Sequence, residues 1–230
     1  MLHAQERSDT YKHKGLRKKL VTALREKGIT DENVLAAIEK IPRHFFLDPA
    51  FERIAYEDRA FPISAGQTIS QPFTVAFQTQ HLNIRPFEKV LEIGTGSAYQ
   101  ACVLAEMGAR VFTIERQRDL FQYNNDFFYL KHYPSIRRFY GDGFEGLPSY
   151  APFDKIIITA AAPFIPPKLI DQLRQNGCMI LPVDDPADGE ANNEPGQQKM
   201  KLIRKTETGI KEETLGDFSF VPMLKGKSGQ

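Results

Sequence analysis

Strand and helix signals alternate from residue 72 to residue 183, and this alternation allows only a few folds. Short apolar runs bounded by turn-forming residues predict strands, and the amphipathic stretches between them predict helices. The predicted strands cover residues 89–93, 110–115, 136–140, 154–160 and 177–183. The predicted helices between them cover residues 97–107, 117–131 and 166–176. Strands that alternate with helices form a mostly parallel sheet covered on both faces, so we expect a Rossmann-like α/β fold.

The first third of the chain is predicted to be helical. Apolar residues recur at helical spacing between residues 14 and 27, and Gly28 follows where a helix-ending glycine is common. A second helix is predicted to begin after Thr30 or Asp31 and to stop at Pro42. Residues 42–71 have many aromatic and turn-forming residues without a period. A connection of this length is often functional.

Two parts are therefore expected. Residues 1–71 would form helices and a substrate-side loop that pack on a main domain of residues 72–230. In that domain, residues 199–206 and 211–221 predict an antiparallel hairpin that closes the sheet. The polar, acidic loop of residues 184–197 is interpreted as solvated surface.

A glycine-rich loop connects the first strand of the main domain to the following helix. Its sequence from Leu91 to Ala98 is LEIGTGSA. Glycines there allow a tight turn and let a ligand approach the backbone at a helix N-terminus. A G-x-G alone is weak evidence, but its position between strand and helix favours a cofactor loop. The predicted cofactor-binding residues of this loop are Gly94, Thr95, Gly96 and Ser97.

Two details favour S-adenosylmethionine over a dinucleotide. Glu92 lies near the strand end, where its carboxylate would repel a pyrophosphate but would suit the cationic amino and sulfonium groups of S-adenosylmethionine. Tyr99 occupies the place of the third glycine in a dinucleotide G-x-G-x-x-G and is too bulky for close helix–strand packing. A nicotinamide dehydrogenase is therefore disfavoured.

Two further strands end in acidic residues that suit the same ligand. Glu115, about 20 residues after the glycines, can accept both ribose hydroxyls. Asp142, followed by Gly143, could reach the adenine amino group. The alternatives are a surface acid near a helix start for Glu115 and a local turn for Asp142. All of these positions lie at carboxyl ends of strands, where open α/β sheets bind ligands.

The sequence resembles the protein-L-isoaspartate O-methyltransferase family over about residues 14–183. The Gln67–Pro72 stretch, QTISQP, is more family-specific than the glycine loop. The segments that carry the resemblance are residues 42–46, 56–63, 66–72, 92–97, 99–100, 141–143, 160–163 and 169–173. Membership implies methylation of the α-carboxylate of L-isoaspartyl residues in damaged proteins. The ester then closes to a succinimide, which partly hydrolyses back to aspartate.

The resemblance also assigns residues for the substrate. Ser70 is the residue implied for the active site, and we interpret its hydroxyl as a donor that holds the substrate carboxylate. The alternative for Ser70 is the N-cap of the helix that begins near Pro72, and the two roles can coexist. The other predicted substrate-binding residues are Gln67, Thr68, Ile69 and Ala161. A peptide α-carboxylate has a pKa near ~3.5, so a general base would have nothing to remove.

One residue departs from the family pattern. Ala98 stands where the family usually has glycine. An extra methyl group in the first turn of a helix would be tolerated or favoured, although the affinity for S-adenosylmethionine could change. The likeness is thin beyond Val183, so contacts from Val221 and Pro222 are only a guess.

Composition excludes several classes of partner. The chain has 30 Lys and Arg against 29 Asp and Glu, which predicts neither nucleic-acid nor membrane binding. No signal peptide or long apolar run is evident, and Cys102 and Cys178 suggest buried apolar residues, so a cytoplasmic location is expected. A monomer is the expected state, although the sequence does not determine it. The histidines lack neighbours at ligand spacing, which predicts no metal site. The alternatives are a same-fold methyltransferase acting on RNA or a small molecule, and a non-catalytic S-adenosylmethionine-binding module.

Overall fold

A seven-stranded sheet forms the centre of the protein. The computed structural model describes residues 7–184 and 197–229. The strand order is β5-β4-β3-β6-β7-β8-β9, in which β5 to β7 are parallel and β8 and β9 continue the sheet antiparallel. Their bounds are β3 Lys89–Ile93, β4 Arg110–Glu115, β5 Ile136–Tyr140, β6 Phe153–Ile158, β7 Leu173–Asp184, β8 Gln198–Thr206 and β9 Gly209–Phe218. The predicted Rossmann-like sheet with a C-terminal hairpin is confirmed, and three of its strands have the predicted bounds.

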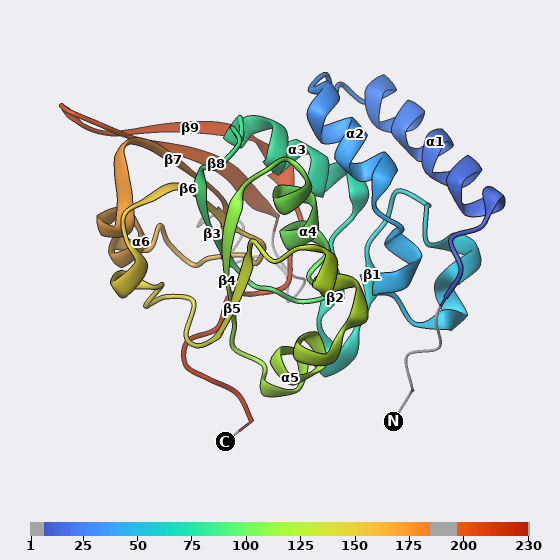
Figure 1. The fold of residues 1–230 in the computed structure, drawn as a ribbon. Coiled ribbons are helices and arrows are strands. Elements are labelled where there is room, and N and C mark those ends of the chain that lie inside the picture. The colour runs from blue at the N-terminus through green and yellow to red at the C-terminus, as the bar shows by residue number, and fades with distance from the viewer. Residues whose placement is uncertain (1–6, 185–196, 230) are drawn as a thin grey trace.

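Helices cover both faces of this sheet (Figure 1). Four helices contribute to one core: α1 Tyr11–Glu26, α2 Glu32–Lys40, α3 Pro72–Leu82 and α4 Tyr99–Glu106. The core on the other face includes α6, Pro167–Gln172. Alternation along β3 serves both cores, since Val90 belongs to the first and Leu91 and Ile93 belong to the second. Strands buried on both faces explain the continuous apolar runs in the sequence.

The N-terminal helices lie where the sequence predicts them, although α1 begins at Tyr11, before the predicted residue 14. In α1 the Thr10 side chain and His13 form a capping box, and Gly28 follows the helix with a φ of +97°. In α2 the Asp31 carboxylate accepts hydrogen bonds from the backbone N–H groups of Asn33 and Val34. Apolar residues of both helices belong to the same core as α3 and α4, so the N-terminal part shares the core of the main sheet.

The segment between α2 and α3 is folded around a buried arginine. It contains the short helices η1 Arg43–Phe46, η2 Pro49–Ile54 and η3 Ser64–Gly66, and the antiparallel strands β1 Phe61–Pro62 and β2 Thr68–Ile69. The guanidinium of Arg43, which is completely buried, donates to the carbonyl oxygens of Ala55 at 3.1 Å and Ser70 at 2.8 Å. It also lies 4.9 Å from the centre of the Tyr99 ring. Arg43 therefore joins this segment to α4.

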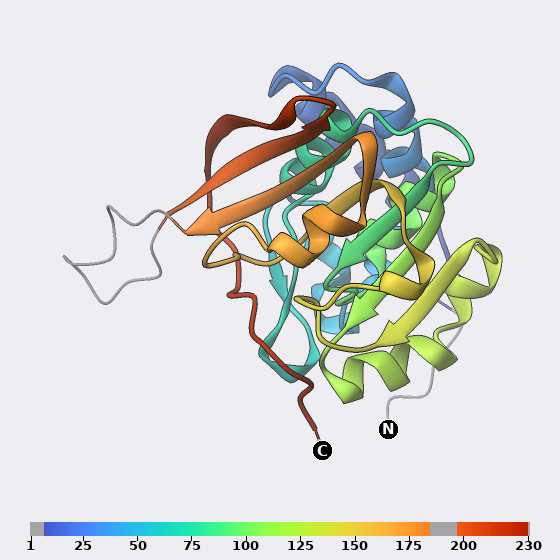
Figure 2. The ribbon, with the colours of Figure 1, turned by 90° about the vertical axis from the view of Figure 1, so that its left-hand side faces the viewer.

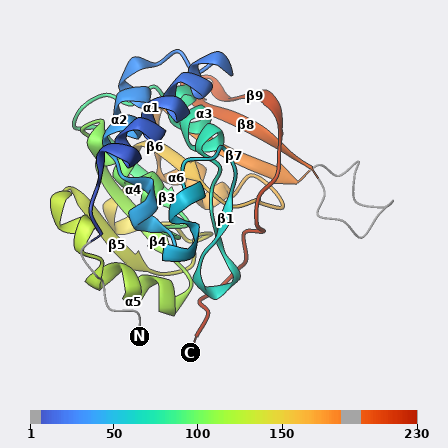
Figure 3. The ribbon, with the colours of Figure 1, turned by 90° about the vertical axis from the view of Figure 1, so that its right-hand side faces the viewer.

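The C-terminal tail lies alongside β1 and β2 (Figures 2 and 3). Backbone hydrogen bonds join Ala161 to Val221 and Met223 at 2.8 and 2.6 Å. Farther along, Arg116 donates to the carbonyl oxygen of Gly226 at 3.0 Å, and the Tyr140 hydroxyl donates to that of Ser228 at 3.0 Å. The tail is thus fixed to the ends of β4, β5 and β6.

Some predicted boundaries are wrong. The helix predicted over residues 166–176 ends at Gln172, because Leu173 already pairs with Phe153 of β6. The helix predicted over residues 117–131 is divided into α5, Arg118–Asp126, and the short helix η4, Phe128–His132. The acidic loop of residues 184–197 lies outside the described residues for most of its length.

Asp58 is expected to stabilise the junction of α1 and α3. Its Oδ1 accepts the N–H of Phe73 in the first turn of α3 at 2.7 Å, and its Oδ2 pairs with the Lys27 ammonium at 2.6 Å. Asp58→Ala should lower the free energy of unfolding in urea by about 1–2 kcal/mol, as loss of a helix cap does. Asp58→Asn keeps an acceptor for the Phe73 N–H, so its free energy of unfolding should fall by less. Equal decreases in the two variants would exclude helix capping as the source of the stabilisation.

Candidate active site

A cavity lies at the carboxyl ends of the parallel strands. Its walls come from the glycine loop after β3, the end of β4, the turns after β5 and β6, and residues 67–70 and 221–224. The lining residues are Gln67, Thr68, Ile69, Ser70, Val75, Ile93, Gly94, Thr95, Gly96, Ser97, Tyr99, Gln100, Ile114, Glu115, Arg116, Gly143, Thr159, Ala160, Val221, Pro222, Met223 and Leu224. The cavity thus brings together most of the residues that the sequence predicts for cofactor and substrate.

The glycine loop leaves its backbone open to this cavity. Gly94 has a φ of +96°, and a Cβ there would lie 2.6 Å from Thr159 Oγ1, which donates to the Gly94 carbonyl oxygen at 2.9 Å. Any larger residue would displace that hydroxyl. Thr95 and Ser97 are nearly buried in the same loop; the Thr95 hydroxyl lies 2.6 Å from that of Thr113. The loop is therefore held from the sheet side and presents its other side to a ligand.

Glu115 holds the glycine loop in place and still has hydrogen-bond acceptor positions free for a ligand. Its Oε2 accepts the N–H of Gly96 at 2.8 Å, and its Oε1 accepts the N–H of Gln117 at 2.8 Å. Burial raises the pKa of the Glu115 carboxyl, and these N–H groups oppose the rise. A carboxylate oxygen has two acceptor positions, so each oxygen can still accept one hydroxyl.

Asp142 lies beside the cavity rather than on its wall. Its Oδ1 accepts the N–H of Phe144 at 2.9 Å, which is the local turn considered from the sequence. Its Oδ2 accepts the N–H of Gly226 at 2.7 Å and so holds the C-terminal tail. Gly143 lines the cavity, and a Cβ there would lie 2.4 Å from a methyl carbon of Ile93.

Glu92 is completely buried away from the cavity. It pairs in register with Thr113 and Ile157, which places its side chain on the face of the sheet covered by α1 to α4. Neither carboxylate oxygen has a hydrogen-bond partner among the described residues. Burial raises the pKa of Glu92 to about 8. A neutral carboxyl group behind the glycine loop differs from the cofactor-facing carboxylate that the sequence suggested.

Ser70 lines the cavity and has an unused hydroxyl. The N-cap residue of α3 is Gln71, without a side-chain cap, and Asp58 supplies the capping carboxylate, so the interpretation of Ser70 as the cap is wrong. The Ser70 backbone is held by Arg43, while its Oγ makes no hydrogen bond within the described part of the chain. Gln67, Thr68 and Ile69 line the same wall.

The turn after β6 lines the cavity with Ala160 rather than with the predicted substrate-binding residue Ala161. Ala161 does not line the cavity; its N–H and carbonyl group bond to the tail, and Ala160 lines the cavity instead. Thr159 and Gln100 also line the cavity, and no site role was predicted for either, although Gln100 lies in the 99–100 segment that carries the family resemblance. Thr159 could have been found as a hydroxyl residue at a strand end.

Comparison with known proteins identifies the family. Residues 15–228 match the model for protein-L-isoaspartate(D-aspartate) O-methyltransferase. Relatives described as protein-L-isoaspartate O-methyltransferase include one from Flavobacterium johnsoniae, 51% identical over 96% of this chain and 99% of its own, and one from Cytophaga hutchinsonii, 50% identical over 96% of each. The chain belongs to this family.

A solved family structure has the same fold. The protein-L-isoaspartate O-methyltransferase of Plasmodium falciparum, in complex with S-adenosyl-L-homocysteine, is 25% identical with a TM-score of 0.77 and covers 91% of this chain and 99% of its own. Similarity to the family thus continues beyond Val183, where the sequence suggested that it becomes thin. The match to the family model includes the C-terminal tail up to residue 228.

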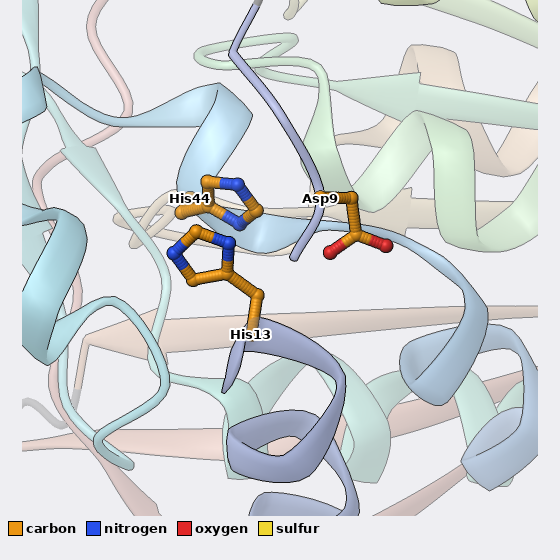
Figure 4. Close-up of side chains that lie close together, drawn as sticks. All are labelled: Asp9, His13 and His44. Carbon is orange, nitrogen blue, oxygen red and sulfur yellow. The ribbon is translucent and has the colours of Figure 1, made fainter. Parts of the chain in front are cut away.

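One histidine cluster lies outside the cavity (Figure 4). Asp9, His13 and His44 bring possible ligand atoms within 4.8 Å of one another, although the sequence suggested no such grouping. Their geometry favours a structural role. Both Asp9 oxygens accept hydrogen bonds from the Arg17 guanidinium at 2.7 Å, and the two imidazole rings stack at 3.9 Å, so their lone pairs do not converge. Burial lowers the pKa of His44 to about 4, which keeps it neutral beside Arg17 and His13.

Ala98 is the N-cap of α4 and has a left-handed backbone, with φ +67° and ψ 11°. The expectation that alanine suits this site as a first-turn helical residue is wrong, because left-handed conformations favour glycine. Ala98→Gly removes strain of about 1–2 kcal/mol. The same substitution removes a buried methyl group, which costs about 0.8 kcal/mol. It also gives the unfolded chain more conformational freedom, which costs about 0.4–1 kcal/mol. The net change in unfolding free energy should stay within about 1 kcal/mol.

Ala98→Val is the contrasting variant, since a β-branched side chain strongly resists a positive φ. Ala98→Val should lower the free energy of unfolding in urea, and by clearly more than any change that Ala98→Gly causes. Similar values for the two variants would contradict the left-handed conformation.

Glu92 should make stability depend on pH. Its raised pKa means that the folded protein holds a proton which the unfolded chain releases above its usual pKa of 4.5. The free energy of unfolding should therefore fall from about pH 5 to pH 8, by up to ~1.4 kcal/mol per pH unit. Glu92→Gln should reduce this slope, leaving the contribution of Glu115, whose pKa burial also raises, and should be more stable than the parent at pH 8, as measured by urea denaturation across pH. An unchanged slope in the variant would show that Glu92 is not its source.

Proposed function

We propose that this protein transfers a methyl group from S-adenosylmethionine to the α-carboxylate of L-isoaspartyl residues in damaged proteins. The resulting ester would begin repair by closing to a succinimide. The observation that supports this most directly is the Ser70 hydroxyl, which is free of other hydrogen bonds among the described residues and lines the same cavity as the glycine loop.

The residues around the glycine loop fit S-adenosylmethionine. Glu115 would accept the ribose hydroxyls, and the backbone of Gly94 and Gly96 would allow close approach. Thr95, Ser97 and Gly143 would complete the wall. Asp142 would act mainly by holding Gly143 and the tail in place. Glu92 would support the loop from behind as a neutral group.

The reaction needs alignment rather than a general base. Bound S-adenosylmethionine supplies an electrophilic methyl group on a cationic sulfur. The substrate carboxylate is already ionised, with a pKa near ~3.5, so no proton has to be removed. The protein must hold the carboxylate in line with the methyl group and exclude water. Buried residues on the wall, such as Ile69 and Met223, suit the exclusion of water.

Ser70 would orient the substrate. Its backbone position is fixed by the Arg43 hydrogen bond, so its hydroxyl projects from a rigid support. A hydroxyl that donates to a carboxylate stabilises the bound substrate without acting as a nucleophile. Gln67, Thr68 and Ile69 on one wall and Ala160 on the other would receive the peptide on either side of the carboxylate.

The location and oligomeric state of the enzyme are also proposed. We propose a cytoplasmic monomer that acts on proteins without nucleic acid or membrane. No helix among the described residues is long and apolar enough to cross a membrane.

Methyl transfer to a matched peptide pair tests the proposal. Peptides that differ only in L-isoaspartate and L-aspartate are incubated with labelled S-adenosylmethionine, and base-labile label is counted. We expect labelling of the isoaspartyl peptide alone. Ser70→Ala should lower kcat/KM about 10- to 100-fold, the value of one hydrogen bond to a charged group. Ser70→Thr keeps the hydroxyl, so its kcat/KM should fall by less than that of Ser70→Ala.

Ser64→Ala provides the control, because Ser64 is exposed in the same segment and does not line the cavity. Unchanged turnover in Ser70→Ala would remove that residue from the proposal. S-adenosylmethionine binding without labelling of the isoaspartyl peptide would favour RNA, a small molecule or a non-catalytic binding module.

A further inference from the structure

A second cavity lies at the amino-terminal edge of the sheet, opposite to the edge that carries the active site. Its volume is about 350 Å³, and it is bounded by the starts of β3, β4 and β5 and by the short helix η5, Pro148–Tyr150. Three cationic side chains line it, from Lys89, Arg110 and Arg137, and none of its lining residues is acidic. Ser135 and Ser149 add hydroxyl groups.

Strand register places the three cations on one face. Lys89 pairs with Arg110, and Arg137 pairs with Phe112, two residues along β4 from Arg110. Because alternate residues of a strand share a face, the side chains of Lys89, Arg110 and Arg137 all project to the same side. Like charges on adjacent strands repel each other, so this arrangement carries an electrostatic cost.

Nothing in the described part of the chain neutralises these charges. None of the three cations has a carboxylate within 4.0 Å. The Lys89 ammonium donates to the Tyr150 carbonyl oxygen and lies 5.5 Å from the centre of the Phe112 ring. The Arg137 guanidinium lies 5.5 Å from that ring, and Arg110 Nε donates to the Phe87 carbonyl oxygen at 2.9 Å.

Nearby acidic groups are engaged elsewhere. Asp154 pairs with Arg174, and its other oxygen accepts the Lys89 backbone N–H at 2.8 Å. Glu88 lies 3.9 Å from the Lys155 ammonium and accepts the Arg85 N–H at 2.8 Å. The positive charge of the cavity is therefore left for a ligand.

We infer that this cavity binds the phosphate group of a small molecule. Guanidinium groups bind phosphate with two parallel hydrogen bonds, an ammonium adds a point charge, and serine hydroxyls donate to the remaining oxygens. The multiple negative charge of a phosphate matches three cations better than the single charge of a carboxylate. The site is separate from the methyl-transfer site, which lies at the other end of the same strands.

Pyrophosphate serves as the probe, titrated into the protein saturated with S-adenosylhomocysteine, so that the active site is filled. Isothermal calorimetry at low ionic strength should detect binding at one site. Arg110→Gln and Arg137→Gln alter exposed side chains and should each weaken binding about tenfold, one charge-assisted hydrogen bond. The double variant should lose binding. Arg204→Gln, an exposed residue of β8, is the matched control and should bind as the parent does.

Circular dichroism and S-adenosylhomocysteine affinity should be unchanged in all variants, which separates loss of the site from loss of the fold. Absence of pyrophosphate binding to the parent protein, or equal affinity in the parent and the double variant, would overturn the inference. Equal weakening by Arg204→Gln would show that only overall charge matters, and would also overturn it.

Discussion

The parallel pairing of β3 with its neighbours is the constraint on which the site depends. Ile93 pairs with Ile114 of β4 and with Ile158 of β6, so the three strands end at the same level. Whatever follows each strand is therefore brought to one edge of the sheet. The hydrogen bond from the Gly96 N–H to Glu115 then joins the turn after β3 to the end of β4. Without in-register parallel strands, residues far apart in sequence would not share a cavity.

The other wall of the cavity depends on a buried cation. Arg43 is completely buried and has no carboxylate partner among residues 7–184 and 197–229; carbonyl oxygens and the face of Tyr99 stabilise its charge instead. Burial lowers the pKa of Arg43 to about 10, which still leaves the guanidinium protonated at neutral pH. This arrangement fixes the Ser70 backbone against α4. The segment between α2 and α3 therefore supports the site through Arg43 and also lines it with residues 67–70.

Charge is distributed unequally between the two edges of the sheet. At the carboxyl edge, Glu115 and Asp142 accept backbone N–H groups and hold the glycine loop and the tail. At the amino edge, Lys89, Arg110 and Arg137 project together without a carboxylate partner in the described ranges. The two edges thus differ locally: carboxylates hold the backbone at one, and three cations cluster at the other, although Arg116 also lines the active-site cavity and Asp154 and Glu88 lie near the amino edge. A net charge of +1 does not reveal this cluster, because composition averages over the whole surface.

The sequence by itself determined the fold class, the approximate positions of the strands and the glycine loop, because apolar periodicity and turn residues are local signals. It also determined the family, through motifs such as Gln67–Pro72.

Only the tertiary structure decided which side each side chain faces. Glu92 is adjacent to the loop in sequence, yet the alternation of β3 buries it behind the sheet. Ala98 adopts a left-handed conformation because the loop must turn there, and helix propensity could not indicate this. The contacts of Arg43, the exchange of Ala161 for Ala160 and the position of the tail depend on residues distant in sequence. Such contacts are set by packing, which no local pattern encodes.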